Sequence, residues 1–253
     1  MQDATRLDDQ VAIVTGAARG IGRGIALVLA EAGASIVIGD LLDSSETVAQ
    51  VEALGGRAVS MQMDTSKPDD AQALVDLALS AFGRLDILVN DAGIDAPSGN
   101  VWDLPDEEWQ RVIDVNLSGV FYCSRAALRP MLEAGRGAIV NISSQSARIG
   151  SRGMSPAYNT SKAGVLGLTM AFSAHVADKG IRVNAVTPGL VRSKEFGWSR
   201  EEDEGKTAEY PLGLGSPRDI GEAVRYLASP ASRWVSGTAL HIAGGYQKGS
   251  NWF

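Results

Sequence analysis

The stretch TGAARGIG, residues 15–22, follows an apolar run, Val11 to Thr15, and leads directly into a helical pattern. Gly16 allows the chain to turn sharply, Gly20 lets the backbone approach a diphosphate, and Gly22 lets the helix pack closely on the sheet. The N-terminus of the helix offers unpaired N–H groups and a partial positive charge to the anion. The spacing differs from G-x-G-x-x-G, so the strand-turn-helix context is what favours nucleotide binding over a plain tight connection.

Short apolar runs alternate with helical patterns along nearly the whole chain. The predicted strands are Val11 to Thr15, Ser35 to Asp40, Ala58 to Gln62, Leu85 to Asn90, Ala138 to Ser143, Arg182 to Val186 and Ala239 to Ile242. The predicted helices are Gly22 to Glu31, Ser45 to Leu54, Asp69 to Phe82, Glu107 to Met131, Ala157 to Asp178 and Asp219 to Leu227. Strands that are apolar throughout are typical of a sheet covered on both faces. The pattern predicts a Rossmann-type α/β fold, a doubly wound, seven-stranded parallel sheet flanked by helices.

No linker, internal repeat or low-complexity segment divides the chain, so we expect residues 1–253 to form a single domain. The least regular part is 187–215, which is rich in charge and glycine. Long irregular segments inside a domain are usually functional. We therefore expect a substrate lid at about 190–215, with a short helix of its own.

The composition argues against several classes of protein. A formal net charge of -7 opposes binding to phosphate backbones, so we expect no nucleic-acid partner. The single cysteine, Cys123, cannot form an internal disulfide, and His175 and His241 lie far apart, so we expect no metal site. Residues 1–10 lack the basic and apolar regions of a signal peptide, and no run approaches the roughly 20 apolar residues that cross a bilayer. We expect a cytoplasmic protein with no membrane partner.

The second predicted strand ends at Asp40, eighteen residues beyond Gly22. A carboxylate at this place can accept hydrogen bonds from both adenosine ribose hydroxyls and repels a 2′-phosphate. Arg19 favours the opposite choice, because an arginine in the turn can pair with that phosphate. A close fixed negative charge excludes a phosphate, whereas a flexible arginine can swing away, so we expect NAD as the cofactor. The alternative is that Asp40 is a solvated carboxylate at the end of a strand.

Tyr158 and Lys162 stand four residues apart at the front of a long predicted helix, which places both on one face. A free tyrosine has a pKa of about 10 and is a poor base at neutral pH. A nearby ammonium, together with the positive ring of an oxidised nicotinamide, is expected to lower that pKa. Tyr158 can then take a proton from an alcohol or supply one to a ketone. Ser144, at the end of the fifth predicted strand, can hydrogen-bond the substrate oxygen as charge develops on it.

Together these features resemble the short-chain dehydrogenase/reductase family, and the match runs from about Gln10 to Gly245. The family's glycine pattern is met by Thr15, Gly16, Gly20 and Gly22, and its Asn-Asn-Ala-Gly pattern corresponds to Asn90-Asp91-Ala92-Gly93. Its acidic residue near the adenine corresponds to Asp64, which Thr65 follows, and its nicotinamide-amide segment to Pro188, Gly189, Val191 and Ser193. Its catalytic residues correspond to Asn116, Ser144, Tyr158 and Lys162.

The resemblance implies an NAD-dependent oxidoreductase that transfers a hydride between nicotinamide and a secondary alcohol or its ketone. Asn116 would hold a helix kink and a water that relays protons from Lys162, and Lys162 would also bind the nicotinamide ribose. A purely structural role for Asn116 is the alternative. The expected cofactor-binding residues are Gly16, Arg19, Gly20, Ile21, Gly22, Asp40, Leu41, Asp64, Thr65, Asn90, Ala92, Gly93, Tyr158, Lys162, Pro188, Gly189 and Val191.

The chain departs from the family pattern at three places. Asp91 puts a carboxylate where an amide normally braces the central strands. The interval from Ser144 to Tyr158 is one residue longer than the commonest spacing, which leaves Ser143 and Ser146 as alternatives for the working hydroxyl. Ala243 replaces an aspartate often found before the terminal glycine pair.

The substrate is expected to be a small polar secondary alcohol or ketone, such as a polyol, sugar or hydroxy acid. The loops expected around it carry aromatic residues and arginines that can stack on a ring or hold a carboxylate, namely Trp102, Phe196, Trp198, Arg148 and Arg152 beside Gln145. The equally weighted alternative is that these arginines are solvated and that the aromatic side chains fill contacts between subunits. Alternative functions are reduction of 3-oxoacyl or cyclic ketone substrates, and a non-catalytic NAD-binding sensor. A serine hydrolase using Ser144 and His241 is disfavoured, because no Gly-x-Ser-x-Gly elbow surrounds Ser144.

The helical runs 107–131 and 157–178 carry many alanines and leucines and few charges. Such faces often need a partner, and the resemblance implies that these helices pair between subunits. We expect a homo-oligomer, a homotetramer or a dimer. The terminal Asn251-Trp252-Phe253 is expected to dock on a neighbouring subunit or on its own.

Overall fold

A computed structural model describes residues 3–95, 100–149, 154–193 and 199–246 of the chain. Its sheet contains β1 (Val11–Thr15), β2 (Ser35–Asp40), β3 (Ala58–Gln62), β4 (Ile87–Asn90), β5 (Gly137–Ile142), β6 (Ile181–Pro188) and β7 (Ala239–Ile242). The strands are ordered β3-β2-β1-β4-β5-β6-β7, and every neighbouring pair is parallel. The predicted doubly wound, seven-stranded parallel sheet is confirmed.

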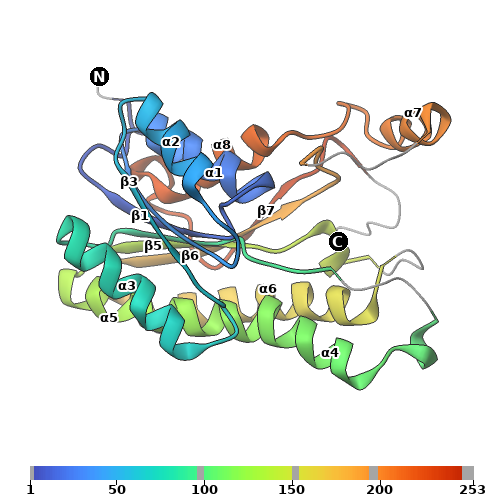
Figure 1. Ribbon diagram of the computed structural model, residues 1–253, viewed down its shortest axis with the longest axis horizontal. Helices are drawn as coiled ribbons and strands as arrows, with labels where there is room; N and C mark the ends of the chain where they lie inside the picture. Colours follow the sequence, from blue (N-terminus) through green and yellow to red (C-terminus); the bar gives the residue numbers. More distant parts are fainter. Residues whose placement is uncertain (1–2, 96–99, 150–153, 194–198, 247–253) are drawn as a thin grey trace.

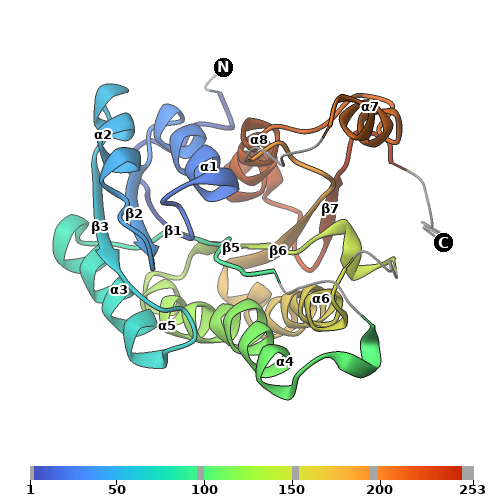
Figure 2. The ribbon, with the colours of Figure 1, turned by 45° about the vertical axis from the view of Figure 1, so that its right-hand side comes forward.

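Helices cover both faces of this sheet (Figure 1). The α-helices of the described residues are α1 (Gly20–Glu31), α2 (Ser45–Ala53), α3 (Pro68–Phe82), α4 (Asp106–Ile113), α5 (Gly119–Ala134), α6 (Pro156–Val176), α7 (Arg200–Ala208) and α8 (Pro217–Ala228). Helices α1, α2 and α8 form one layer, and α3, α4, α5 and α6 form the other, as Figure 2 shows from a second direction. Helix α7 lies apart from both layers and is the short helix predicted within 190–215.

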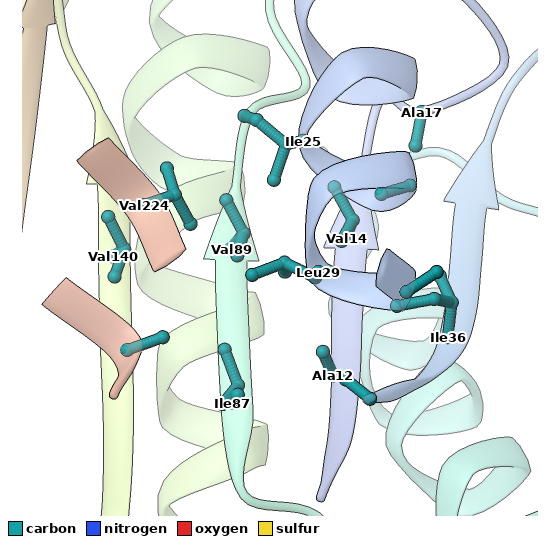
Figure 3. Close-up of a cluster of buried hydrophobic side chains, with 14 of the residues drawn as sticks. Ala12, Val14, Ala17, Ile25, Leu29, Ile36, Ile87, Val89, Val140 and Val224 are labelled. Atoms are coloured by element: carbon teal, nitrogen blue, oxygen red, sulfur yellow. The ribbon is translucent and has the colours of Figure 1, made fainter. Parts of the chain in front are cut away.

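The sheet is buried on both faces, and its central strands are apolar apart from Thr15, Asn90 and Asn141 near their carboxyl ends. Along β1, Ala12 and Val14 face the layer of α1 and α8, whereas Val11 and Ile13 face the opposite layer. Figure 3 shows the first of these two cores, in which Leu29 and other side chains of α1 pack on the strands. Alternate side chains of a strand point to opposite faces, so a strand between two helical layers has to be apolar throughout.

Helices α1 and α8 approach each other closely through glycine. A Cβ built on Gly24 of α1 would lie 2.4 Å from Cβ of Pro217, at the start of α8. A Cβ on Gly221 of α8 would lie 2.8 Å from Cγ2 of Val28 on α1. These approaches hold the helix that follows the TGAARGIG stretch in a fixed position over the sheet.

The helical pattern from Glu107 to Met131 forms two helices joined by one wider turn, at the place where the resemblance implied a kink. Its first part, α4, is followed by a π-helical turn, η2 (Asp114–Ser118), and then by α5, which continues to Ala134. A period of 3.6 residues places the apolar face correctly but does not reveal one turn with a wider hydrogen-bond step. The wide turn contains Asn116, and π-helical turns are frequent at functional sites.

Candidate active site

The candidate site lies where the order of the sheet reverses, between β1 and β4. The glycine-rich stretch follows β1, and Asp91 to Gly93 follow β4. Gly16 has a φ of +73°, and a Cβ on it would lie 2.7 Å from Cα of Ala92. The two segments therefore touch through backbone atoms, and glycine is required at position 16. In open parallel sheets a ligand binds at this point of reversal.

The turn leads into α1 with its first amides directed at the site. Gly20 has a φ of +63°, and a Cβ on Gly22 would lie 2.3 Å from the carbonyl oxygen of Gly16. The N-cap residue, Arg19, makes no side-chain capping bond and is exposed. Ile21 packs against the core under α1. The N-cap residue itself therefore provides no side-chain oxygen to the end of the helix, where an anion can bind.

Asp40 has a structural partner that the sequence did not reveal. Its Oδ2 accepts a hydrogen bond from the backbone N–H of Ala18 at 2.8 Å, and its Oδ1 accepts one from Leu42 at 2.9 Å. The carboxylate therefore joins the end of β2 to the glycine-rich turn and is not simply solvated. An ionised carboxylate has about four acceptor positions, so the two bonds leave capacity for ribose hydroxyls. The neighbouring side chain, Leu41, is 54% exposed.

Asp64 and Thr65 stand beside Asp40, because the Met63 N–H donates to the Asp40 carbonyl at 2.9 Å. The Asp64 carboxylate accepts a hydrogen bond from the Ser66 N–H at 2.9 Å. Thr65 is buried against the start of α5. The structure therefore places both predicted adenine-side residues at the edge of the sheet that carries Asp40.

Asn90 belongs to a buried polar network that sequence reasoning missed in part. Its Nδ2 donates to Ser124 Oγ at 3.0 Å and to Asn141 Oδ1 at 2.8 Å. Asn141 Nδ2 donates in turn to Thr169 Oγ1 at 3.0 Å. The network links β4 and β5 to α5 and α6. The available signal was a polar residue, Asn141, within an otherwise apolar strand.

The segment after β4 is fastened to β1 and leaves room for other side chains. Thr15 Oγ1 accepts hydrogen bonds from the N–H groups of Asp91 and Ala92, both at 3.2 Å. A Cβ on Gly93 would lie 3.3 Å from Asn116 Oδ1 and 3.4 Å from Lys162 Nζ. Gly93 therefore allows two of the predicted catalytic side chains to reach this segment.

The side chain of Asn116 makes structural hydrogen bonds to the backbone of the loop after β4. Its Oδ1 accepts a hydrogen bond from the Ile94 N–H at 2.8 Å, and its Nδ2 donates to the Ile94 carbonyl at 2.9 Å. Nδ2 also reaches Ser161 Oγ on α6 at 3.2 Å. The expected interruption of the helix is present, and it directs this amide at the loop after β4.

Among three neighbouring serines, Ser144 is the one whose side chain is hydrogen-bonded to the Tyr158 phenol. Its oxygen also accepts a hydrogen bond from the Ser146 N–H at 3.1 Å. Ser143 instead donates to the Lys162 carbonyl at 2.7 Å, and Ser146 Oγ is buried. The geometry therefore favours Ser144 over the two alternatives as the hydroxyl beside the phenol.

Lys162 is only 5% exposed, and its Nζ donates to the Ile142 carbonyl at 3.0 Å. Nζ lies 5.7 Å from the centre of the Tyr158 ring. Removal from water lowers the pKa of Lys162, and the carboxylates of Asp91 and Asp95 act against that change. The predicted pair thus meets on one face of α6.

The pKa of Tyr158 differs from the expectation. Removal from water raises it to about 12, the hydrogen bond with Ser144 acts to lower it, and Asp95 and Asp91 raise it further. Burial is the main reason why the lowering of this pKa expected beside Lys162 is not found, and the two carboxylates add to the effect of burial.

The segment after β6 is tied to the loop after Ser144 by Tyr210, which sequence reasoning had not singled out. Tyr210 Oη accepts a hydrogen bond from the Leu190 N–H at 3.1 Å and one from Gln145 Nε2 at 2.8 Å. The Tyr210 ring is buried and stacks on Tyr246 with centroids 4.8 Å apart. No sequence period marks such a contact, because Gln145 and Tyr210 are 65 residues apart.

The predicted nicotinamide-amide segment lies at the end of β6. Pro188 is the last residue of that strand, and the Gly189 N–H donates to the Ile242 carbonyl at 2.8 Å. A Cβ on Gly189 would lie 2.7 Å from Cβ of Ala243. Val191 is buried and bridges to Gly215. The small residue at 243 therefore packs directly under the segment.

The structure describes only some of the side chains that were expected near a substrate. Trp102 is 79% exposed, and Arg148 is exposed on the loop after Ser144. The others, Arg152, Phe196, Trp198 and the terminal residues 251–253, lie outside the described residues. Within the described ranges, no group of three His, Cys, Asp or Glu side chains is arranged to hold a metal ion. None of the helices in those ranges is both long and apolar enough to cross a membrane.

Comparison with protein families matches residues 16–247 to the family described as enoyl-(acyl carrier protein) reductase. The chain is 42% identical over 241 residues to cis-4-hydroxycyclohexanecarboxylate dehydrogenase of Sinomonas cyclohexanicum, covering 94% of this chain and 96% of that protein. It is 38% identical over 246 residues to cyclohexanol dehydrogenase of Acinetobacter sp. strain SE19, covering 96% and 97% of the two proteins. A 3-oxoacyl-[acyl-carrier-protein] reductase of Vibrio cholerae is 38% identical over 241 residues, covering 94% of this chain and 98% of that protein.

Solved structures agree with these relatives. A crystal structure described as a short-chain alcohol dehydrogenase from Sinorhizobium meliloti 1021 has a TM-score of 0.92 and 34% identity, covering 98% of this chain and all of that one. A crystal structure from Agrobacterium tumefaciens, described as a 2-deoxy-D-gluconate 3-dehydrogenase with bound NADP, has a TM-score of 0.88 and 33% identity, covering 97% and 99% of the two chains. The similarity therefore extends over the whole fold.

Proposed function

Because the chain belongs to the short-chain dehydrogenase/reductase family and is an oxidoreductase of alcohols or ketones, we propose that it uses NAD to oxidise a small polar secondary alcohol. The observation that carries this proposal is the side-chain hydrogen bond between Ser144 and Tyr158, with Lys162 Nζ 5.7 Å from the phenol ring. These three groups are what proton transfer to or from an alcohol oxygen requires.

Each catalytic side chain has a distinct role in this proposal. Ser144 hydrogen-bonds the substrate oxygen, and Tyr158 accepts the alcohol proton in oxidation or returns it in reduction. Lys162 supplies a buried positive charge that favours the phenolate. Asn116 holds the loop at Ile94 through its two backbone bonds and so acts as a positioning residue. The nicotinamide, when bound, takes up or gives the hydride and adds positive charge in its oxidised form.

The residues after β1, β2 and β4 suit a dinucleotide. The N-cap residue of α1, Arg19, makes no side-chain capping bond, and a Cβ on Gly20 would lie 3.7 Å from Cβ of Ser193, an ordinary contact that leaves the glycine-rich turn unobstructed by its own side chains. Asp40, fixed by Ala18 and Leu42, supports NAD, because a held carboxylate repels a 2′-phosphate. The residues proposed to hold NAD are Gly16, Arg19, Gly20, Ile21, Gly22, Asp40, Leu41, Asp64, Thr65, Asn90, Ala92, Gly93, Tyr158, Lys162, Pro188, Gly189 and Val191.

The names of two relatives support a narrower proposal for the substrate. Two of them are named for alcohols on a six-membered ring, and one of these substrates also carries a carboxylate. The proposed substrate is a hydroxy acid on a small ring, which fits both these names and the polar substrate expected from the sequence. The exposed Arg148, on the loop after Ser144, is a candidate to bind its carboxylate. In this proposal residues 190–215 form the lid of a one-domain, cytoplasmic protein that assembles as a homo-oligomer.

The test is an alcohol panel with NAD and NADP, in which NADH or NADPH formation is followed by absorbance. The panel holds cyclohexanol, cis-4-hydroxycyclohexanecarboxylate, polyols, sugars and linear hydroxy acids. Wild-type protein should oxidise a ring hydroxy acid with NAD, whereas Tyr158→Phe should lose about 10³-fold in kcat and keep its affinity for NADH. Turnover confined to 3-oxoacyl thioesters would contradict the proposed substrate. Dinucleotide binding without turnover of any member would favour a sensor.

A further inference from the structure

Asp91 carries a negative charge at a place where the glycine-rich turn is expected to receive a diphosphate. Its carboxylate accepts a hydrogen bond from the backbone N–H of Gly22, in the first turn of α1. A Cβ on Gly22 would lie 2.7 Å from Asp91 Oδ2, so the carboxylate is in direct contact with the turn. The backbone of Asp91 is held by Thr15 Oγ1 at 3.2 Å. The charge is therefore fixed at the N-terminus of the helix.

Charged groups from two elements act on this carboxylate. Lys162 of α6 attracts it, and Asp40 of β2 repels it. Asp95, on the same loop as Asp91, acts with it on Lys162 and Tyr158. The ammonium of Lys162 is thus shared between two loop carboxylates, so it neutralises Asp91 only in part.

We propose that the ionisation of Asp91 sets the affinity for the dinucleotide. The ionised carboxylate, held at the Gly22 amide, repels the diphosphate, whereas the protonated carboxyl group does not repel it. The amide that occupies this place in the family pattern has no such charge. Asp91 would therefore make cofactor binding depend on proton uptake at one identified side chain. The inference rests on the proposed binding of NAD.

Asp91 changes its charge near neutral pH, so its effect on dinucleotide binding depends on pH in that range. Removal from water raises the pKa of Asp91 to about 7, while Lys162 and the Gly22 N–H act to lower it and Asp40 to raise it. A diphosphate beside the carboxylate raises that pKa again, because two negative charges are then close together. Binding must then take up a proton near neutral pH, and the affinity must fall as the pH rises from the pKa of Asp91 in the free protein to its higher pKa in the complex.

The test measures dissociation constants for NADH, by its fluorescence, and for ADP-ribose, by calorimetry, at pH 6.5 and 8.5. ADP-ribose keeps the diphosphate and lacks the nicotinamide, so it isolates the proposed repulsion. For wild-type protein both constants should rise about sixfold, the change expected if the diphosphate raises the pKa from about 7 to about 8. Asp91→Asn keeps the side-chain shape and an acceptor for Gly22, and its constants should be low at both pH values.

Asp95→Asn is the matched control, because it removes another carboxylate that acts on Lys162 and keeps the contact between Asp91 and Gly22. It should keep the pH dependence of the wild-type protein. The same sixfold change in Asp91→Asn, or its loss in Asp95→Asn, would overturn the proposal. If Asp91→Asn fails to fold, the binding enthalpy of wild-type protein in two buffers of different ionisation enthalpy gives the protons taken up at pH 7.5. No uptake would overturn the proposal as well.

The two proposals fail in different ways. If neither NADH nor NADPH binds wild-type protein or Asp91→Asn at either pH, the proposed function is wrong. If wild-type protein binds NADH with the same affinity at both pH values, only the role of Asp91 is wrong.

Discussion

The Asp40 carboxylate accepts a hydrogen bond of 2.8 Å from the Ala18 amide, which joins the end of β2 to the turn after β1. A residue expected to determine the choice of cofactor therefore also supports the glycine-rich turn. Replacing Asp40 with alanine changes two things at once, the negative charge at the end of β2 and the support of the turn.

Asp40→Ala should lower the preference for NAD over NADP at least tenfold, because the charge that repels a 2′-phosphate is lost. It should also destabilise the protein by about 1 kcal/mol, since the Ala18 amide loses its acceptor. The measurements are kcat/KM with both cofactors and a denaturant titration. Asp40→Asn separates the effects, as it keeps an acceptor but not the charge. An unchanged cofactor preference in both variants would contradict the proposal that Asp40 selects NAD over NADP.

Ser144→Ala should mainly reduce activity, whereas Ser143→Ala should mainly reduce stability. Loss of Ser144 removes the hydroxyl bonded to Tyr158 and should reduce kcat about 10²-fold. Loss of Ser143 removes its 2.7 Å bond to the Lys162 carbonyl and should mainly cost stability, about 1 kcal/mol. Steady-state kinetics and thermal unfolding of the two variants check this. A larger loss of kcat in Ser143→Ala would reverse the assignment.

Asp95→Asn should shift the pH profile of alcohol oxidation to lower pH. Asp95 raises the pKa of Tyr158, so removing its charge favours the phenolate and lowers that pKa. Oxidation uses the phenolate, so the rising limb of kcat/KM against pH should move down by on the order of 0.5 pH unit. Asp178→Asn, at an exposed ion pair with Lys179, serves as the control and should leave the limb in place. A shift to higher pH would show that the sign of this interaction is wrong.

Tyr210→Phe should raise KM for the alcohol several-fold and affect kcat less. The substitution removes the acceptor for Leu190 and Gln145 but keeps the ring that stacks on Tyr246. We expect a loss of about 1–2 kcal/mol in stability as well, because a backbone N–H beside a buried ring loses its partner. Tyr246→Phe, which keeps the same stack, is the comparison. Equal effects of the two changes on KM would refute a role for the Tyr210 hydroxyl.

Gly24→Ala should destabilise the protein by more than 2 kcal/mol, because its Cβ would lie 2.4 Å from Pro217 and force α1 away from α8. Gly205→Ala on α7 is the matched helical control, since a Cβ there meets nothing within 4 Å. That change should be neutral or stabilise by about 0.5–1 kcal/mol. Chemical denaturation of both variants measures the difference, and similar free energies of unfolding would argue against the packing described.

Much of the fold was predictable because its signals are local. Strands such as Val11–Thr15 and Ser35–Asp40 were predicted to the residue, since an apolar run bounded by turn residues suits a strand covered on both faces. The π-helical turn at Asp114–Ser118 was not predictable, as one wider turn leaves the apolar period almost unchanged. The family resemblance, rather than the apolar period, implied a kink at Asn116, which lies within that turn.

By itself, the sequence determined the order of strands and helices, the glycine-rich turn and the one-turn spacing of Tyr158 and Lys162. These depend on the φ angles open to glycine and on the repeat lengths of helix and strand, which neighbouring residues set. Only the tertiary structure decided that Asp40 holds Ala18, that Tyr210 joins Gln145 to Leu190, and that Asp91 lies against Gly22. Those contacts join residues far apart in the chain, and the pKa values of Tyr158 and Asp91 depend on the burial and charges that such contacts create.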